Sequence, residues 1–397
     1  MKYRTLGRTG LKVSEVGLGG EWFNGLSEEE SIRIVDAAEQ NGVNYIDIFM
    51  PQAPTRDHLG AALKGRREKF LIQGHLCTVY EDEQYTRTRD IEKTKRSFED
   101  LLHRLQTDYI DIGMIHYVDS EEDFQTVFGG EIIEYAKELK EKGIVRYLGM
   151  SSHNPHIAKK AAETGLIDVL MFSINPAYDL ESPETDIYDL MDFKGMGENG
   201  WVVDEARQEL YSYCESAGVA ITVMKTLAAG TLLSAEASPF GVAMTVPQCI
   251  QYALDRNGVK CVIVGCHSVE EVLKAVRYDQ LSEQERSYAH IFASGNQINM
   301  TGRCMYCNHC QPCPAHIDIA AVTKFLDLAS SQPEVPETVK QHYWSLNATA
   351  ADCLMCGRCE PNCPFGVKVR ENLKKAGNTI CVSGFCFYKV TTDSQQR

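Results

Sequence analysis

Short apolar runs alternate with amphipathic stretches over roughly the first 290 residues of the chain. Most of the runs are almost continuously apolar, which is typical of parallel strands buried on both faces. The stretches between them carry helix signals: Ser27 with Glu30 predicts a capping box, and Gly42 suits the position that follows a helix end. The runs predicted as strands are Val13–Gly17, Asn44–Ile48, Phe70–Gln73, Tyr109–Ile115, Val145–Met150, Val169–Ser173, Ala220–Met224 and Cys261–Val264.

Eight strand–helix units predict an α/β fold of the (β/α)8 TIM barrel type for residues 1–295. The alternative is an open doubly wound sheet, whose first turn usually carries G-x-G-x-x-G. The first turn here reads GLGGEWFNG, which lacks that spacing, so the barrel is the predicted fold. The connection after the sixth strand, from Asn175 to about Asp204, is unusually long. Its length is equally compatible with a substrate lid and with a surface insertion that has no role.

The charge of the chain narrows the range of partners. The 397 residues include 55 acidic and 40 basic side chains, which give a net charge of −15. Phosphate backbones and anionic lipid would repel so acidic a protein, so we expect neither nucleic-acid nor membrane partners. The sequence has no apolar run of spanning length, and MKYRTLGRTG lacks the apolar stretch of a signal peptide. These features predict a cytoplasmic protein.

Eight of the 15 cysteines fall in two short runs near the C-terminus. In a reducing compartment, such a cluster is more often a metal site than a set of disulfides. The second run, CLMCGRCEPNCP, has the C-x2-C-x2-C-x3-C-P spacing of bacterial ferredoxins, and the first, CMYCNHCQPCP, is one residue shorter before its last cysteine. In two-cluster ferredoxins the fourth cysteine of each run binds the other cluster.

The two runs therefore predict a small, mainly helical, ferredoxin-like domain at residues 296–377, followed by a tail at 378–397. A single cluster or a zinc site is the minority alternative, because zinc sites usually use two separated C-x2-C pairs. We predict two [4Fe–4S] clusters, one held by Cys304, Cys307, Cys310 and Cys363 and the other by Cys353, Cys356, Cys359 and Cys313.

Several stretches resemble the aldo-keto reductase family: the opening YRTLGRTGLKVSEVGLGG, then YIDI, LGAALKGRREK, DYIDIGMIH and VRYLGMSSH. The resemblance spans the predicted barrel. The chain from end to end is similar to the subgroup that carries a C-terminal ferredoxin-like domain with two clusters. The resemblance implies a (β/α)8 barrel, an active site at the strand ends and NAD(P)H-dependent carbonyl reduction.

The resemblance carries two of the family's four catalytic residues onto this chain. The catalytic Asp falls on Asp47 and the His falls on His116. The position of the proton-donating Tyr holds Gln52, and the position of the Lys that lowers the Tyr pKa holds His75. Because an amide cannot deliver a proton at neutral pH, Gln52 can only orient a substrate or donate a hydrogen bond.

The positions that bind the nicotinamide cofactor in the family are also altered. The family's Ser-Asn pair after strand five is Ser151-Ser152 here, and its Gln at strand six is Met171. The segment after strand eight lacks the basic residues that hold a 2′-phosphate, although Lys225 and the small residues of MKTLAAGTLL could still hold a phosphate. We therefore expect weak NADPH binding, with a flavin or a partner ferredoxin as alternative electron donors.

Polar residues that end neighbouring barrel strands meet on one rim, where such enzymes carry their chemistry. Asp47, His75 and His116 each end a predicted strand. His75 beside Asp47 could act as a general acid in place of the missing Tyr, with Tyr80 or Tyr85 as weaker substitutes. The same trio could instead form a 2-His-1-carboxylate metal site, which we rank lower.

Three functions follow from these motifs. The leading hypothesis is a redox enzyme that passes electrons between two clusters and a small carbonyl or hydroxyl compound at the rim. The second is a lyase or isomerase with His75 and His116 as acid and base and with structural clusters. The third is a non-catalytic electron carrier. The first leads because cysteines at cluster spacing are the most specific motif in the chain.

Overall fold

The computed structural model describes residues 1–193, 196, 202–294, 302, 304–330 and 335–380. The chain divides into two compact units, Met1–Tyr288 and Ala289–Arg397. None of the helices in the described ranges is both long and apolar enough to cross a lipid bilayer.

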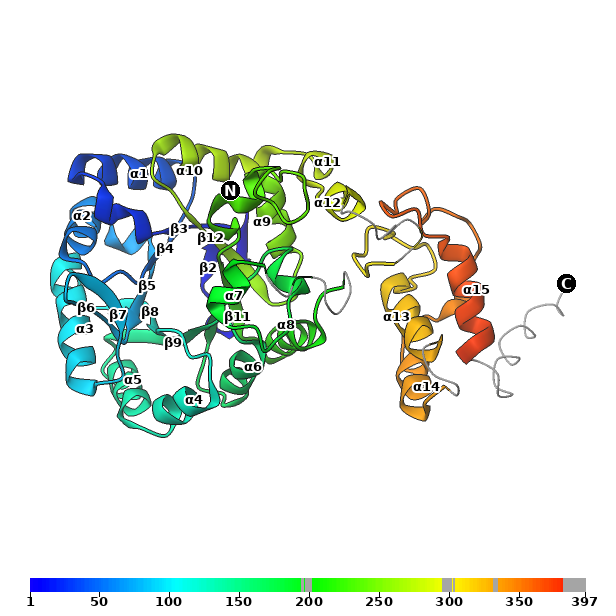
Figure 1. Ribbon diagram of the computed structural model, residues 1–397, viewed down its shortest axis with the longest axis horizontal. Coiled ribbons are helices and arrows are strands. Elements are labelled where there is room, and N and C mark those ends of the chain that lie inside the picture. The colour runs from blue at the N-terminus through cyan, green and yellow to red at the C-terminus, as the bar shows by residue number, and fades with distance from the viewer. Residues whose placement is uncertain (194–195, 197–201, 295–301, 303, 331–334, 381–397) are drawn as a thin grey trace, which may run out of the picture. The chain divides into compact units, whose positions relative to one another are not determined.

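The first unit contains a closed barrel of eight parallel strands, so the predicted (β/α)8 fold is confirmed (Figure 1). The strands follow one another around the barrel in the order of the sequence. Tyr45, Ile112, Met114 and Val169 are among the side chains that fill the interior. The barrel strands are β3 (Val16–Gly19), β4 (Tyr45–Ile48), β5 (Leu71–Leu76), β8 (Ile110–Ile115), β9 (Val145–Ser152), β10 (Val169–Ser173), β11 (Ala220–Met224) and β12 (Val259–Gly265).

Helices follow the barrel strands and bury one apolar face each. In α3, Phe98, Leu101 and Leu105 are buried, as the helical spacing predicts. The predicted capping box of Ser27 and Glu30 is present at the start of α1, and Gly42 follows that helix with a φ of +79°. The helices of this unit are α1 (Glu28–Gln40), α2 (Ala53–Leu63), α3 (Ile91–Leu105), α4 (Glu121–Phe128), α5 (Glu131–Glu141), α6 (Pro155–Glu163), α7 (Ile187–Met191), α8 (Glu205–Ala217), α9 (Val246–Leu254), α10 (Val269–Val276) and α11 (Glu283–Arg286).

The first predicted strand, Val13–Gly17, is wrong in its bounds. The chain there forms two separate elements that break at Glu15, and the Ser14 hydroxyl donates across the break to the Val16 carbonyl oxygen at 2.7 Å. Strand β2 (Lys12–Ser14) pairs with β1 (Tyr3–Thr5) as an antiparallel hairpin, and only β3 joins the barrel.

A second antiparallel hairpin, β6 (Thr78–Glu81) with β7 (Gln84–Arg87), directly follows barrel strand β5. Its register places Tyr80 opposite Tyr85. The loop after strand three is therefore a folded element at the C-terminal end of the barrel strands, and not an irregular connection.

The long connection after β10 begins with a buried carboxylate. Asp179, in the short 3-10 turn Tyr178–Leu180, accepts hydrogen bonds from the hydroxyls of Tyr211 at 2.6 Å and Tyr252 at 2.8 Å. The start of the connection is thus fastened to α8 and α9. Residues 194–195 and 197–201 of the connection lie outside the described residues, so the lid stays a prediction.

The second unit is mainly helical where the structure describes it. Its helices are α12 (Ala289–Ser294), α13 (Ile319–Ser330), α14 (Glu337–Trp344) and α15 (Val369–Ile380), and α13 packs against α15. The sequence predicts α13 and the start of α14 between the cysteine runs. The predicted tail begins at residue 378; residues 378–380 belong to helix α15, and the rest of the tail lies outside the described residues.

Candidate functional site

Three of the four predicted catalytic residues form one hydrogen-bonded chain at the barrel rim. Asp47 lies in β4, His75 lies in the adjacent parallel strand β5, and His116 directly follows β8. His75 Nε2 lies 2.9 Å from Asp47 Oδ1, and His75 Nδ1 lies 2.8 Å from His116 Nδ1. Their exposed fractions are 2%, 2% and 7% respectively for Asp47, His75 and His116. We call this set, with Tyr85 described next, the rim relay.

Tyr85 completes the rim relay from the β6–β7 hairpin. Its hydroxyl forms a hydrogen bond with His116 Nε2. Phe49 stacks on the His116 ring with an interplanar angle of 8° and packs edge-on against Tyr85. Tyr80, the other tyrosine predicted as a substitute, is 49% exposed. Of the two, the structure therefore brings Tyr85 to the histidines.

Gln73, which the sequence reasoning missed, holds the inner end of the relay. Its amide nitrogen donates to Asp47 Oδ1, and its amide oxygen accepts from the Tyr45 hydroxyl at 2.7 Å. Gln73 is fully buried in the barrel interior. An amide two residues before His75, in the run FLIQGHL, was the signal that could have found it.

The fourth predicted residue, Gln52, lies apart from the relay's hydrogen bonds. It stands immediately before α2 and is 8% exposed, and its side-chain oxygen has no hydrogen-bond partner in the part of the chain that the structure describes. Gln52 does not take the place of a proton donor here.

Burial sets the protonation of the outer relay groups. Burial, assisted by His75 and Arg89, holds the pKa of His116 well below its ordinary value of 6.5. Burial, followed by the neighbouring Tyr117, raises the pKa of Tyr85 well above its ordinary value of 10.0. Both groups are therefore neutral near pH 7, which is the state in which each can both give and accept a hydrogen bond.

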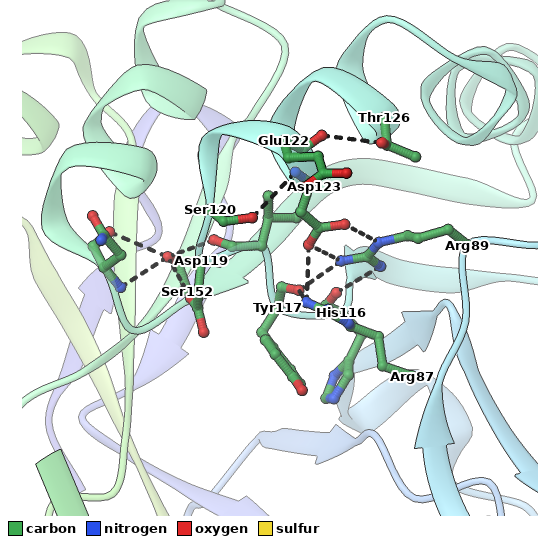
Figure 2. Close-up of polar contacts among 12 residues, drawn as sticks. Arg87, Arg89, His116, Tyr117, Asp119, Ser120, Glu122, Asp123, Thr126 and Ser152 are labelled. Atoms are coloured by element: carbon green, nitrogen blue, oxygen red, sulfur yellow. Dashed lines mark hydrogen bonds and ion pairs between the residues drawn. The ribbon is translucent and has the colours of Figure 1, made fainter. Parts of the chain in front are cut away.

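Two arginines tie the hairpin to the loop that carries His116 (Figure 2). Arg89 donates to the His116 carbonyl oxygen at 3.0 Å and to the Tyr117 carbonyl oxygen at 2.6 Å. Arg87, the last residue of β7, donates to the same Tyr117 oxygen at 3.1 Å, and both guanidinium groups bind the Asp123 carboxylate of α4. These bonds fix Tyr85 and His116 relative to one another.

The predicted cofactor positions Ser151 and Ser152 end β9, whereas Met171 lies in the middle of β10 and belongs to the barrel core; these side chains have few hydrogen-bonding groups left for a ligand. The Ser152 hydroxyl already donates to the Val118 carbonyl oxygen at 2.8 Å, and Met171 Sδ lies 3.2 Å from the Gln73 amide nitrogen. The Ser151 hydroxyl is buried without a partner in the described structure. These side chains offer one unused polar atom, that of Ser151, to a ligand.

Lys225 follows β11 on the same rim. Its φ is +59°, and its carbonyl oxygen accepts from the Asn175 side chain at 3.0 Å. Burial lowers the pKa of Lys225, and the negative charges of Glu21 and Asp119 partly offset this. Burial likewise raises the pKa of Glu21, against the effect of Lys225. A cation and two carboxylates therefore lie near one another on the rim.

Within the described ranges, no three Cys, His, Asp or Glu side chains converge on a point where one metal ion could be held. At the rim the reason is visible: Asp47, His75 and His116 follow one another in a line, and both ring nitrogens of His75 are occupied by its neighbours. The 2-His-1-carboxylate alternative is therefore not supported.

The two cysteine runs have matching backbones. Tyr306 in the first run (φ +51°) and Met355 in the second (φ +52°) are left-handed, and each stands two positions after the first cysteine of its run. Asn308 and Gly357, each directly after the second cysteine, are left-handed as well. The His316 amide donates to the Cys313 carbonyl oxygen at 2.9 Å, and the Gly366 amide donates to the Cys363 carbonyl oxygen at 3.2 Å. Each donor stands three residues after the fourth cysteine of its run. Helices α13 and α15 each begin six residues after the fourth cysteine. The runs are thus two copies of one loop-and-helix unit.

Thiols of the two runs affect one another's pKa. Burial, with help from Cys307 and from Cys363 of the second run, raises the pKa of Cys304 to about 11. Burial, with help from Cys304, Cys307 and Cys363, raises the pKa of Cys310 to about 12. In the second run, burial raises the pKa of Cys359, with Cys353 and Cys356 among the neighbours that add to it. The crossed ligand assignment stays a prediction.

Backbone amides point at two of these sulfur atoms. The Met355 amide donates to Cys353 Sγ at 3.4 Å, and the Val367 amide donates to Cys363 Sγ at 3.4 Å. Hydrogen bonds to sulfur are among the features that tune iron–sulfur clusters. Amide hydrogen bonds to these two sulfur atoms suit the chemistry of a thiolate ligand.

Comparison with known proteins identifies the relatives of the barrel. The profile of the Aldo/keto reductase family matches residues 15–248. The uncharacterized oxidoreductase YqkF of Bacillus subtilis is 26% identical over 297 residues, which is 72% of this chain and 94% of that protein. L-galactose dehydrogenase of Arabidopsis thaliana is 26% identical over 302 residues, covering 68% of this chain and 86% of that protein.

Among solved structures, the holo form of aldo-keto reductase AKR11C1 from Bacillus halodurans is similar to this chain, with a TM-score of 0.59 and 25% sequence identity. The match covers 75% of this chain and 97% of that one. The relatives carry oxidoreductase names, and the similarity in fold extends over nearly the whole length of the solved chain.

Proposed function

The chain belongs to the aldo/keto reductase family of oxidoreductases, and we propose that it is an iron–sulfur member that reduces a small carbonyl compound with electrons held in two [4Fe–4S] clusters. The observation that carries the proposal is the repeated cysteine loop, because a barrel reductase that receives a hydride from a nicotinamide has no need of it. A reducing cytoplasm, which the sequence predicts, keeps such thiols available for iron.

The residues that would hold the clusters are the eight cysteines in their crossed sets. The grouping of Cys363 with the first run supports the set of Cys304, Cys307, Cys310 and Cys363, which leaves Cys353, Cys356, Cys359 and Cys313 for the other. When bound, clusters of this kind supply electrons one at a time, so two clusters hold the two electrons that a carbonyl reduction needs. The electrons would reach them from a one-electron donor such as a ferredoxin or a reduced flavin.

The residues of the rim relay would handle the protons. Reduction of a carbonyl to an alcohol consumes two protons along with two electrons, and one proton must reach the substrate oxygen. His116, His75 and Asp47 hold a proton within a connected, buried chain at the strand ends, where barrel enzymes bind substrate. The chain is complete without the Tyr and Lys of the family's catalytic set.

NAD(P)H is the alternative electron source. Lys225 and the Ser151 hydroxyl would be its polar contacts, while Ser152 and Met171 are engaged elsewhere in the fold. We propose that the nicotinamide cofactor binds weakly and that the clusters are the working reductant.

A lyase or isomerase is a second candidate, favoured by the same relay, because acid–base chemistry by His75 and His116 requires no electrons. It predicts turnover while the clusters are held oxidised. A non-catalytic carrier predicts electron exchange with a partner protein and no effect of any change in the rim relay.

The test begins with anaerobic purification of the full chain. The proposal expects about eight irons per chain and a broad absorbance near about 400 nm that bleaches with dithionite. Methylglyoxal serves as a carbonyl compound that can be reduced, and L-galactose serves as a hydroxyl compound that can be oxidised. Addition of methylglyoxal to the reduced protein should restore the absorbance and form the alcohol. A colourless protein with stoichiometric zinc would overturn the proposal.

A further inference from the structure

We propose that Tyr85, carried by the β6–β7 hairpin, is the residue that exchanges a proton with the substrate, and that His116, His75 and Asp47 act behind it as a proton relay. This inference rests on the proposed function, since it assigns the proton step of that reaction. It places the proton donor on an element outside the barrel strands, at a position different from that of Gln52.

Accessibility within the relay singles out Tyr85. Asp47 and His75 are each 2% exposed, and both ring nitrogens of His75 are engaged by its neighbours. His116 is 7% exposed, and its outward nitrogen, Nε2, is covered by the Tyr85 hydroxyl. Tyr85 is half-buried and stands at the outer end of the chain. Of the four groups, it is the one that a substrate can reach.

The hydrogen bonds permit one arrangement of protons when Asp47 is a carboxylate and both imidazoles are neutral. His75 then donates from Nε2 to Asp47, which leaves its Nδ1 as an acceptor. His116 must donate from Nδ1 to His75 Nδ1, so His116 Nε2 accepts from the Tyr85 hydroxyl. Every donor therefore points from Tyr85 toward Asp47.

This order defines the proton step. In alcohol oxidation, the substrate O–H bond breaks and its proton moves to Tyr85 Oη. The original Tyr85 proton passes to His116 Nε2, the His116 Nδ1 proton passes to His75, and the His75 Nε2 proton passes to Asp47, which becomes neutral. Carbonyl reduction is the reverse and begins with Asp47 protonated. The relay carries the proton of the substrate oxygen only. In reduction the two reduced clusters supply the two electrons, and the second proton, which forms the C–H bond, comes from solvent; in oxidation the same proton returns to solvent and the oxidised clusters accept the two electrons.

The surroundings hold the outer end of the relay in place. Arg89 binds the His116 carbonyl oxygen, and Arg87 and Arg89 share the Asp123 carboxylate, so the hairpin cannot shift without breaking these bonds (Figure 2). Phe49 packs against both Tyr85 and His116. Fixed geometry of this kind is what proton transfer between hydrogen-bonded groups requires.

The matched pair of variants is Tyr85→Phe and Tyr80→Phe. The two residues face each other in the hairpin register, and each variant removes one phenol hydroxyl from the same element. With dithionite-reduced holoenzyme and methylglyoxal, Tyr85→Phe should slow cluster reoxidation by about 10²–10⁴-fold. Tyr80→Phe, on the exposed side, should stay within about twofold of the wild type, since it lacks a role in the relay. An unchanged rate in Tyr85→Phe would overturn the inference.

A second measurement needs no substrate and no turnover. Nitrogen NMR of the histidine rings should find His116 protonated at Nδ1 and His75 protonated at Nε2. In Tyr85→Phe, the His116 Nε2 resonance should shift because it loses its donor, while Tyr80→Phe leaves it in place. A His116 ring protonated at Nε2 would contradict the relay order. If the protein fails to reduce any probe, the proposed function falls, and this measurement still decides the proton arrangement.

Discussion

The Cys363 thiol adds to the burial that raises the pKa of the Cys310 thiol, although the whole of α13 and α14 separates the two residues in sequence. Each belongs to a different copy of the repeated loop-and-helix unit, and the helices that follow the copies, α13 and α15, pack together. A cluster bound by the first loop would therefore take its fourth ligand from the second. Under this assignment, replacing a single cysteine should remove one particular cluster and leave the other in place.

Replacement of Cys363 by Ser should damage the cluster that Cys304, Cys307 and Cys310 hold, because Ser is a poor substitute for a thiolate ligand. The cluster adjacent to Cys363 in sequence should persist. Iron content should fall by up to about half, and EPR of the reduced variant should retain one of the two signals. Cys313→Ser is the mirror-image control and should remove the other signal. Loss of the sequence-adjacent cluster in Cys363→Ser would refute the crossed ligation.

NADPH should bind weakly to the wild type because Ser152 and Met171 replace a family Asn and Gln, and both are engaged within the protein. Two lost hydrogen bonds at about 0.5–1.5 kcal/mol each correspond to about a 5- to 150-fold weaker Kd. The double variant Ser152→Asn with Met171→Gln should bind correspondingly more tightly in a fluorescence titration. Equally tight binding by the wild type and the double variant would show that other contacts hold the cofactor.

His116 should make the stability of the protein depend on pH. The folded protein keeps His116 neutral, chiefly through burial, whereas the unfolded chain takes up a proton below about pH 6.5. Its contribution to the free energy of unfolding is therefore complete above about pH 6.5 and is lost as the pH falls, by at most about 1.4 kcal/mol per pH unit. Urea unfolding at pH values from about 7.5 to 5 measures this slope.

The control for that slope is His116→Gln, which keeps a polar side chain of similar size and does not titrate. The difference between the wild-type and variant midpoints should shrink as the pH falls. Parallel curves for the two proteins would mean that His116 has the same pKa in the folded and the unfolded chain, and the neutral state held by burial would then be wrong.

The barrel was predictable because its strands are apolar runs that few other folds accommodate. Strands β10 and β11 have the predicted bounds, Val169–Ser173 and Ala220–Met224; a charged residue, Asp168, precedes the first, and another, Lys225, follows the second. The bounds of β3 were not predicted, because the break falls at Glu15, where the Ser14 hydroxyl bonds across it to the Val16 carbonyl oxygen. A local bond of that kind leaves no trace in the periodicity.

The rim relay was predictable in part for a similar reason. Strand ends meet on one rim by topology, so Asp47, His75 and His116 could be grouped before any coordinates. Tyr85 could not be chosen over Tyr80, because the two stand opposite each other in the hairpin and only the side-chain packing on His116 separates their roles. The order of the hydrogen bonds depends on side-chain rotamers, which a sequence pattern does not encode.

His75 and His116 decide between an enzyme and a carrier. His75→Ala removes the middle of the relay and leaves Asp47 with Gln73 as a remaining donor, so folding should survive while proton transfer stops. His116→Ala separates Tyr85 from the buried groups. Each variant should lower turnover by about 10²–10⁴-fold, with iron content and melting temperature measured first.

His75→Lys should also inactivate the protein, because Gln52 supplies no phenol for a lysine to tune. If both alanine variants keep their iron and their fold and still turn over at the original rate, the relay has no part in catalysis. Electron transfer to a partner protein would then be the function to pursue.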